Sequence, residues 1–121
     1  MNYSRAKKAI EATYTDRCTA VEHKKTINKE TKLAGWEDVE VFQNQPCRLS
    51  FQSVRSTQQE GAAEEMIQSV KLFLPPGIAI KEGSKVTVTR EGREFVYTSS
   101  GVPALYPTHQ EIMLELFKGW A

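Results

Sequence analysis

The sequence has few of the residues and runs that metal sites, disulfide frameworks and membrane segments require. Only two of its 121 residues are cysteine, Cys18 and Cys47, and they stand 29 positions apart. Two such cysteines make neither a disulfide framework nor a zinc motif. No run of 18 apolar residues occurs, and no apolar stretch of signal-peptide length follows the basic N-terminal residues. We therefore expect no membrane segment and a cytoplasmic chain with free thiols.

The sequence also lacks a large charge of either sign. Lys and Arg number 16 against 15 Asp and Glu, a net charge of +1, which disfavours a dedicated nucleic-acid or membrane-surface binder. Residues 1–35 nevertheless carry a net +4, residues 36–66 a net −4 and residues 67–121 a net +1. The length predicts a single domain over residues 1–121.

A metal centre is not predicted from the scattered candidate ligands. These ligands are Cys18, His23, Cys47 and His109. Zinc motifs use short paired spacings, which are absent here. We read the cysteines as buried thiols and the histidines as surface groups, and we expect no metal or cofactor.

Catalysis is not predicted either. Ser99 or Ser100 could be combined with His109 and Asp16, but no G-x-S-x-G turn surrounds either serine. The glycines are isolated and form no phosphate-binding loop. We therefore expect a protein that is not an enzyme.

The first third of the chain predicts a helix followed by a strand. Residues 3–12 are rich in alanine with Ser4 as a possible N-cap, so residues 1–13 form a helical arm. From residue 14 to 22 the pattern alternates, and it places Cys18 and Ala20 on one face of a strand. The polar run 23–32 is too charged for burial and predicts a loop or an exposed hairpin.

Further alternating runs predict a small closed β-barrel of about six to seven strands. Two strands, 38–43 and 47–51, are expected on either side of a turn at residues 44–46. Alternation follows over residues 70–74, 78–80, 86–88 and 95–97, and turn residues recur at positions 77, 83, 92 and 101. Residues 56–65 hold no large apolar residue, which predicts a long mobile loop over residues 56–66.

The C-terminal segment 108–118 supports two interpretations. Thr108, Glu111 and Gly119 match the local signals of a capped helix. Ile112, Leu114 and Leu116 alternate as in a strand, and a barrel needs a closing strand. We favour the strand, with residues 117–121 as a C-terminal tail.

Aromatic residues leave two further questions open. Phe95 and Tyr97 lie near basic residues, as in OB-like barrels that bind single-stranded nucleic acid, but the alternation favours a place in the core. Trp36 and Trp120 lie outside the strong strand patterns. Each is either a contact anchor for a partner or a plug over a barrel end.

Four stretches of the sequence carry a resemblance to a known family. These are residues 46–50, 70–76, 80–88 and 100–111. Together they resemble the head-closure proteins of long-tailed bacteriophages and related prophages, also called stopper or head-tail joining proteins. The resemblance runs from about residue 14 to residue 116 and is most specific over residues 101–111.

The resemblance implies a structural virion protein. Family members are small β-barrels that form a ring beneath the portal and adaptor rings. There they retain packaged double-stranded DNA by steric contact and offer a docking surface to the tail, through a tail terminator or tail-completion protein. We therefore expect a virion location at the head-tail connector, reached from the host cytoplasm. The alternative is a small OB-like barrel that binds single-stranded nucleic acid or a cellular protein.

Two sets of residues are candidates for these roles. A ring uses different faces of each subunit, so the basic and acidic segments suggest a head-to-tail interface. Its candidates are Lys24, Lys25, Lys29, Lys32, Trp36, Glu37, Asp38 and Trp120. The position of residues 56–65 matches the channel-facing loop of the family. The candidate gating residues are Gln58, Gln59, Glu60, Gly61, Glu64 and Glu65.

Overall fold

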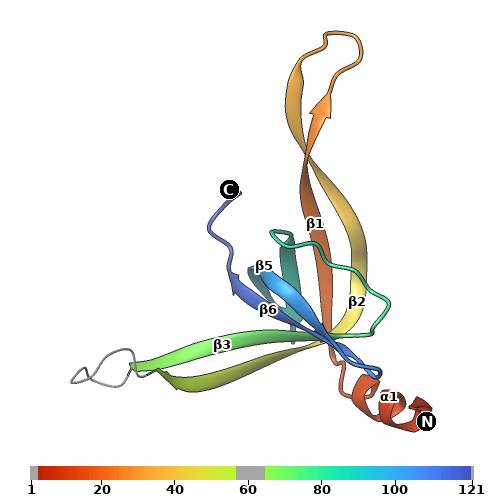
Figure 1. Ribbon diagram of the computed structural model, residues 1–121, viewed down its shortest axis with the longest axis vertical. Coiled ribbons are helices and arrows are strands. Elements are labelled where there is room, and N and C mark those ends of the chain that lie inside the picture. Colours follow the sequence, from red (N-terminus) through yellow and green to blue (C-terminus); the bar gives the residue numbers. More distant parts are fainter. Residues whose placement is uncertain (1–2, 57–64, 121) are drawn as a thin grey trace.

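The computed structural model describes residues 3–56 and 65–120, which form one helix and six strands (Figure 1). Gating candidates Gln58, Gln59, Glu60, Gly61 and Glu64 lie outside the described residues, and Glu65 is the first residue of a strand. The elements are α1 (Ser4–Glu11), β1 (Asp16–Ile27), β2 (Ala34–Ser56), β3 (Glu65–Leu74), β4 (Lys85–Arg90), β5 (Arg93–Leu105) and β6 (Gln110–Leu116).

The six strands close into an antiparallel barrel. Their order around it is β1-β2-β3-β6-β5-β4, and β4 pairs with β1 to complete the circle. The expected fold, a small closed β-barrel with a short N-terminal helix, is therefore confirmed. The C-terminal segment is a strand, as favoured, because β6 is needed between β3 and β5.

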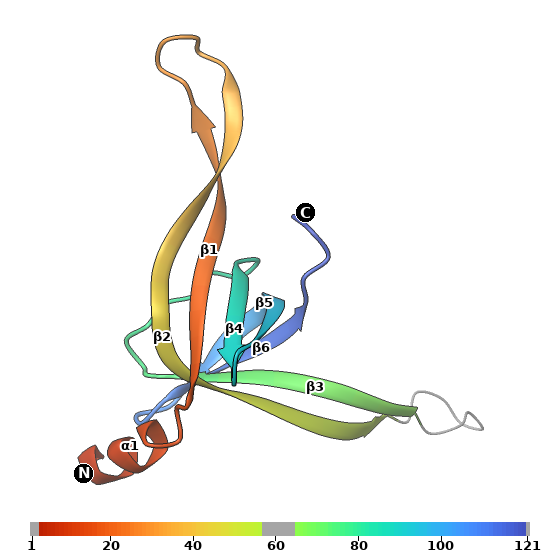
Figure 2. The same cartoon turned by 180° about the vertical axis from the view of Figure 1, so that it is seen from behind.

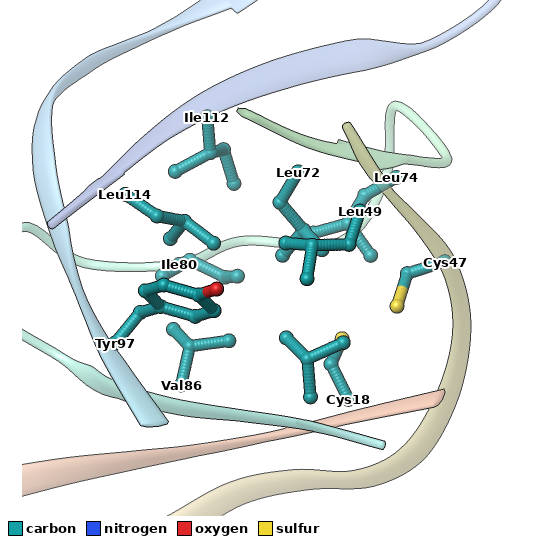
Figure 3. Packing of buried hydrophobic residues seen from close by; sticks show 11 residues of the cluster. Cys18, Cys47, Leu49, Leu72, Leu74, Ile80, Val86, Tyr97, Ile112 and Leu114 are labelled. Atoms are coloured by element: carbon teal, nitrogen blue, oxygen red, sulfur yellow. The ribbon is translucent and has the colours of Figure 1, made fainter. Parts of the chain in front are cut away.

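Alternating side chains from all six strands fill the barrel (Figure 3). The buried cluster is Cys18, Cys47, Leu49, Leu72, Leu74, Ile80, Val86, Val88, Tyr97, Ile112 and Leu114. Both cysteines are free thiols in this core. The hydrogen bond between them and their burial raise the pKa of the Cys47 thiol far above its ordinary value.

Three local predictions were wrong. Tyr3, not Ser4, is the N-cap of α1, and it makes no side-chain cap hydrogen bond. Residues 78–80 form no strand, because residues 76–77 form a turn and the backbone stays irregular up to β4. The predicted turn at residues 44–46 is also absent, since β2 is one strand of 23 residues.

A bulge explains why the turn signal at residues 44–46 misled. The register between β1 and β2 shifts between Cys18 and Ala20, so β2 carries an extra residue there. Asn44 lies at φ 51°, a left-handed conformation that asparagine tolerates. The same residue types that favour a turn here bend a continuous strand instead.

Two long hairpins leave the barrel in different directions (Figures 1 and 2). β1 pairs with β4 only up to Val21, so residues 22–39 form a free two-stranded ribbon, called here the β1–β2 arm. β3 pairs with β6 only from Val70, so residues 52–56 and 65–69 form the described part of a β2–β3 arm. The polar run 23–32 is thus an exposed hairpin, one of its two predicted forms.

No helix within residues 3–56 and 65–120 has the length and apolar character needed to cross a membrane.

Candidate assembly surfaces

The residues considered for catalysis have separate structural partners. The Ser99 hydroxyl donates to the Lys81 carbonyl at 2.7 Å and accepts the Ser84 amide at 3.1 Å. The His109 ring is hydrogen-bonded to Glu111, with Nε2 2.9 Å from Oε2. Asp16 is bound elsewhere, as described below. The structure therefore does not bring these side chains together as a nucleophile, base and acid.

The described residues contain no group of three or more histidine, cysteine or acidic side chains that could hold a metal ion. Cys18 and Cys47 lie inside the barrel, whereas His23 lies on the β1–β2 arm and His109 lies beside β6.

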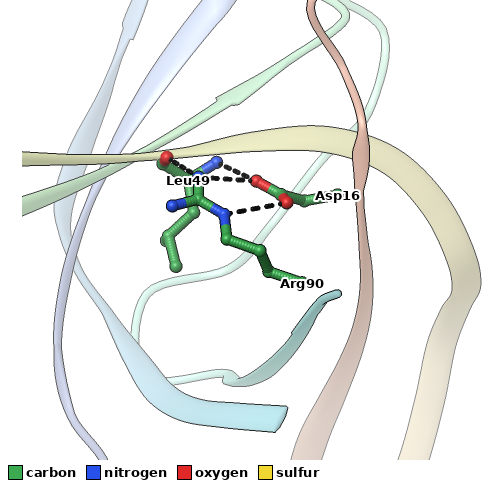
Figure 4. Close-up of polar contacts among 3 residues, drawn as sticks. All are labelled: Asp16, Leu49 and Arg90. Carbon is green, nitrogen blue, oxygen red and sulfur yellow. Dashed lines mark hydrogen bonds and ion pairs between the residues drawn. The ribbon is translucent and has the colours of Figure 1, made fainter. Parts of the chain in front are cut away.

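A buried ion pair joins β1, β2 and β4 where β2 changes partner (Figure 4). β2 pairs with β1 up to Cys47 and with β3 from Arg48. The Leu49 amide donates to Asp16 Oδ2 at 2.9 Å, and Arg90 Nη2 donates to the Leu49 carbonyl. Asp16 is the first residue of β1 and pairs with Cys47, so no residue of β1 lies opposite Leu49. The side chains of Asp16 and Arg90 bond the Leu49 amide and carbonyl instead.

The same contacts set the charge state of Asp16. Burial alone would raise the pKa of Asp16, since its side chain is only 2% exposed. The hydrogen bonds from Arg90 and from the Leu49 amide outweigh burial and hold this pKa below its ordinary value. Asp16 is therefore ionised near neutral pH and belongs to the scaffold.

Both tryptophan rings stack on one histidine, His23. The His23 ring stacks on Trp36 and on Trp120, each with ring centroids 4.7 Å apart and interplanar angles of 6° and 10°. His23 Nδ1 is hydrogen-bonded to Asp38 Oδ1 at 2.8 Å. We call this group of His23, Trp36, Asp38 and Trp120 the clasp, because it fastens the C-terminal tail to the β1–β2 arm.

Further contacts extend the clasp to the barrel. Phe117 meets Trp120 edge to face at 5.3 Å, and Lys85 Nζ lies 5.1 Å from the centre of the Phe117 ring. A cavity of about 180 Å³ opens beside the clasp, between Trp36, Trp120 and residues 81–84. Trp36 keeps 62% of its surface exposed. One face of the Trp36 ring therefore packs on His23 within the clasp, while much of the ring stays accessible.

The charged candidates separate along the β1–β2 arm. Lys24 lies opposite Glu37 and Lys25 lies opposite Trp36 in the strand register. Lys24 Nζ lies 3.7 Å from Glu22 Oε1, so its acidic partner is on its own strand. Lys29 and Lys32 lie in the turn between the strands and form no ion pair with any described residue. Sequence reasoning found these residues from charge alone, but their separation depends on the hairpin register.

The arm carries exposed charges of both signs together with exposed apolar side chains. The tip of the arm holds Ile27, Lys29, Glu30, Lys32 and Leu33, with Ile27 68% and Leu33 69% exposed. Nearer the barrel, Trp36, Asp38 and Glu40 lie on one face of β2, and Glu37 lies on the other face, opposite Lys24. Lys25 lies opposite Trp36, and Val41 is also exposed. Ile27, Leu33, Glu40 and Val41 were not among the predicted site residues. Only exposure identifies them, because their residue types are typical of any strand.

A second hollow lies between α1 and the barrel. It has a volume of about 280 Å³ and is lined by apolar atoms of α1 and Phe73, with Arg48 and His109 beside them. Tyr14 also lines it, and the Tyr14 hydroxyl is buried without a hydrogen-bond partner among the described residues. Burial, aided by the nearby Glu11 carboxylate, raises the pKa of Tyr14 to about 12. No residue of α1 is itself buried.

Comparison with known proteins adds one finding on the fold. No protein-family model matches the sequence, and no curated protein matches it. Among solved structures, the protein xkdH of the phage-like element PBSX from Bacillus subtilis matches with a TM-score of 0.50 and 15% identity. The match covers 81% of this chain and 90% of that chain. At this identity the likeness shows a shared fold.

Proposed function

We propose that this protein is a structural component of a phage or phage-derived particle, where it forms a ring at the head-tail connector. The observation that carries the proposal is the fold shared with a protein of a phage-like element over most of both chains. The sequence resemblance over residues 14–116 supports the same assignment independently. In this role the ring retains packaged DNA and presents a docking surface to the tail.

The two arms support a subunit that is completed by neighbours. Isolated two-stranded ribbons are marginally stable in water. Both arms nevertheless extend beyond the barrel, and the β1–β2 arm exposes Ile27, Leu33 and Trp36. Contacts between copies would bury these side chains and stabilise the arms.

The partners in the proposal follow from the resemblance. A portal or adaptor protein lies on one side of the ring and a tail terminator or tail-completion protein on the other. Packaged double-stranded DNA meets the ring by steric contact only. Retention of DNA by the segment that joins β2 to β3 belongs to the proposal on the same ground.

Deletion of the gene in the phage or prophage that encodes the chain tests this proposal. We expect heads that lack tails and lose DNA, as seen by electron microscopy, and rescue when the purified protein is added to such heads. Normal tailed particles from the deletion strain would contradict the proposal. A deletion strain that fails at an earlier step, such as capsid formation, would also count against the proposal.

Binding of single-stranded nucleic acid by the barrel gains no support from the aromatic residues. Tyr97 is a buried core residue and Phe95 packs against the core, as the alternation favoured. Neither ring is displayed as a platform for bases. An oligonucleotide titration followed by fluorescence anisotropy should show no binding that weakens with salt.

A further inference from the structure

We propose that the hollow between α1 and the barrel, called here the α1 hollow, is a docking site for an acidic peptide segment of a partner protein. The segment inserts one bulky apolar side chain into the hollow. α1 lines one side with Ala9, Ile10 and Thr13, and the barrel lines the other with Phe73 and Arg48. The site goes beyond the proposed ring and does not depend on the connector role.

The size of the α1 hollow fits one side chain rather than a whole small molecule. Its volume is about 280 Å³. Sites for small-molecule ligands typically measure roughly 300–1,000 Å³, whereas a cavity of about 150 Å³ already holds benzene. The walls are mainly apolar, because Ala9, Ile10 and the Phe73 ring form much of them. A leucine or phenylalanine side chain therefore suits the hollow.

The apolar surface continues from the hollow onto the hairpin between β5 and β6. The His109 ring also lines the hollow and stacks on Tyr106 with ring centroids 4.8 Å apart. On its other side His109 lies 5.6 Å from the centroid of the Phe73 ring. Tyr106 and Leu105 are exposed. A peptide anchored in the hollow can therefore bury further apolar surface along this hairpin.

The basic side chains around the hollow favour an acidic partner. Arg48 is exposed, with its guanidinium carbon 5.4 Å from the centre of the Phe73 ring, and it forms no ion pair with any residue that the structure describes. α1 itself carries three cations and one anion, which are Arg5, Lys7, Lys8 and Glu11. Opposite charge on a partner would steer its association with this surface.

The acidic side chains near the hollow already have cationic partners. Glu111 lies 2.9 Å from His109 and accepts a hydrogen bond from Lys71 at 3.3 Å. Glu11 Oε2 lies 3.9 Å from Lys7 Nζ, and Asp16 is paired with Arg90. Residues 101–108 carry no charge. Leaving aside the Asp16 pair, five cations on α1, Arg48 and Lys71 stand against Glu11 and Glu111, a net charge of +3.

The junction between α1 and the barrel is incompletely satisfied. No residue of α1 is buried, and two buried oxygens, the Tyr14 hydroxyl and Glu11 Oε2, have no hydrogen-bond partner among the described residues. Such orphaned groups cost free energy, so an outward shift of α1 that uncovers them is favoured when a guest binds them. A peptide backbone offers a C=O to the hydroxyl and an N–H to the carboxylate, whereas a phosphate group offers acceptors alone. The partner is therefore a polypeptide rather than a nucleic acid.

Selection from a random peptide library displayed on mRNA tests the site. The full chain is the target, and Ala9→Phe, which fills the hollow without a change of charge, is used for counter-selection. We expect enriched peptides in which one leucine, isoleucine or phenylalanine is flanked by aspartate or glutamate. Enrichment of basic peptides, or no enrichment of the full chain over Ala9→Phe, would overturn the inference.

Titration of an enriched peptide, followed by fluorescence anisotropy, gives the second measurement. Arg48→Gln and Ala9→Phe should each weaken binding at least about tenfold, and added salt should weaken it as well. Lys29→Gln removes a positive charge at the tip of the β1–β2 arm, far from α1 (Figure 1), and should have no effect. Ala12→Phe adds the same ring outside the hollow and should also bind normally. Equal affinity in Arg48→Gln and Lys29→Gln would refute the site.

A duplex oligonucleotide separates the two classes of acidic partner. DNA binding that is lost in Arg48→Gln but kept in Ala9→Phe would assign the basic surface to a phosphate backbone and overturn the peptide site. The connector role is tested apart from this site. Peptide binding by a protein that is absent from phage particles would keep the site and remove the connector role, and tailless heads in the deletion strain would keep that role even if no peptide is enriched. Circular dichroism verifies that each variant is folded.

Discussion

Arg90 grips Asp16 with two hydrogen bonds across 74 positions of the chain, from Nε to Oδ1 at 3.0 Å and from Nη2 to Oδ2 at 2.9 Å. The pair also satisfies both backbone groups of Leu49. A side-chain pair thus takes the place of a neighbouring strand where β2 leaves β1. The pair stabilises the fold mainly because it completes the hydrogen bonding of the barrel wall, since a buried ion pair by itself adds little to the free energy of unfolding.

Replacement of Arg90 by methionine should therefore destabilise the barrel strongly. The change leaves the Asp16 carboxylate buried without its cation, and we expect a loss of about 3 kcal/mol in the free energy of unfolding, measured by urea denaturation. This figure is at the low end of the range for broken buried pairs, since the Arg90 side chain is itself 34% exposed. Arg93→Met, which removes an exposed arginine of the same hairpin, is the matched control and should cost little. Equal losses in the two variants would refute the assignment.

Stability should fall in acid because two carboxyl groups have lowered pKa values. The pKa of Asp16 is lowered as described, and a hydrogen bond with His109, helped by Lys71, lowers the pKa of Glu111. Such groups stabilise the fold fully above their unfolded pKa values of about 3.9 and 4.3, and this stability is lost as the pH falls through the lower folded values. The urea midpoint should be steady from about pH 7 to 5 and drop below about pH 4.

Neutral variants provide the control for this pH dependence. Asp16→Asn and Glu111→Gln cannot titrate at these positions, so each should be less stable at neutral pH and should lose less between pH 5 and 3. A wild-type midpoint that stays constant down to pH 3 would contradict the expectation.

The turn between β4 and β5 offers a stabilising substitution. Glu91 and Gly92 form a two-residue hairpin with φ values of 49° and 78°. This is the type I′ geometry, in which Asn-Gly is the preferred sequence. Glu91→Asn should therefore raise the free energy of unfolding by about 0.5–1 kcal/mol, measured by urea denaturation.

Gly92→Ala is the complementary variant at the same turn. Apart from its own residue and its two chain neighbours, no described atom lies within 4 Å of the site that a Cβ would occupy, so the main cost is backbone strain. We expect a loss of about 1–2 kcal/mol. An unchanged stability in both variants would mean that the turn does not have this geometry.

The clasp should hold the C-terminal tail against the arm. In a Trp36→Phe background Trp120 is the only tryptophan, and adding His23→Ala removes the ring on which it stacks. We expect faster quenching of Trp120 fluorescence by acrylamide, with a change in global stability of about 1 kcal/mol or less. His109→Ala, a change at the other histidine, should leave the quenching as it was. Unaltered quenching in His23→Ala would show that the tail is held by other contacts.

The barrel could be predicted from the sequence because apolar residues alternate with polar ones along a strand that buries one face. Cys18 and Ala20 face the core as predicted, and Ile112 and Leu114 revealed the closing strand despite a competing helix signal. The turn signal at Asn44 misled because it marks a bulge in a strand that continues. The choice between turn and bulge depends on the register with β1, which no local pattern contains.

The sites were accessible only in part, for a similar reason. Trp36 and Trp120 were recognised as unusual, but the ring that joins them, His23, comes from a third segment. Lys29 and Lys32 were found from charge, whereas their separation from Glu40 depends on the length of the free hairpin. Nothing in the sequence marked Arg90 as the partner of Asp16. An arginine on a solvent-facing strand position and one that pairs with a buried carboxylate have the same local sequence pattern.

β2 connects the two arms through the barrel, because it pairs with β1 up to Cys47 and with β3 from Arg48. This strand forms one side of each arm, and at 23 residues it would span roughly 75 Å if straight. Asp16 and Arg90 hold it to the barrel wall at Leu49, about two thirds of the way along the strand. Rotation of one arm must therefore either bend β2 near Leu49 or move the other arm as well. Where β2 does not bend, a displacement of the β1–β2 arm would reach the β2–β3 arm through a single covalent strand.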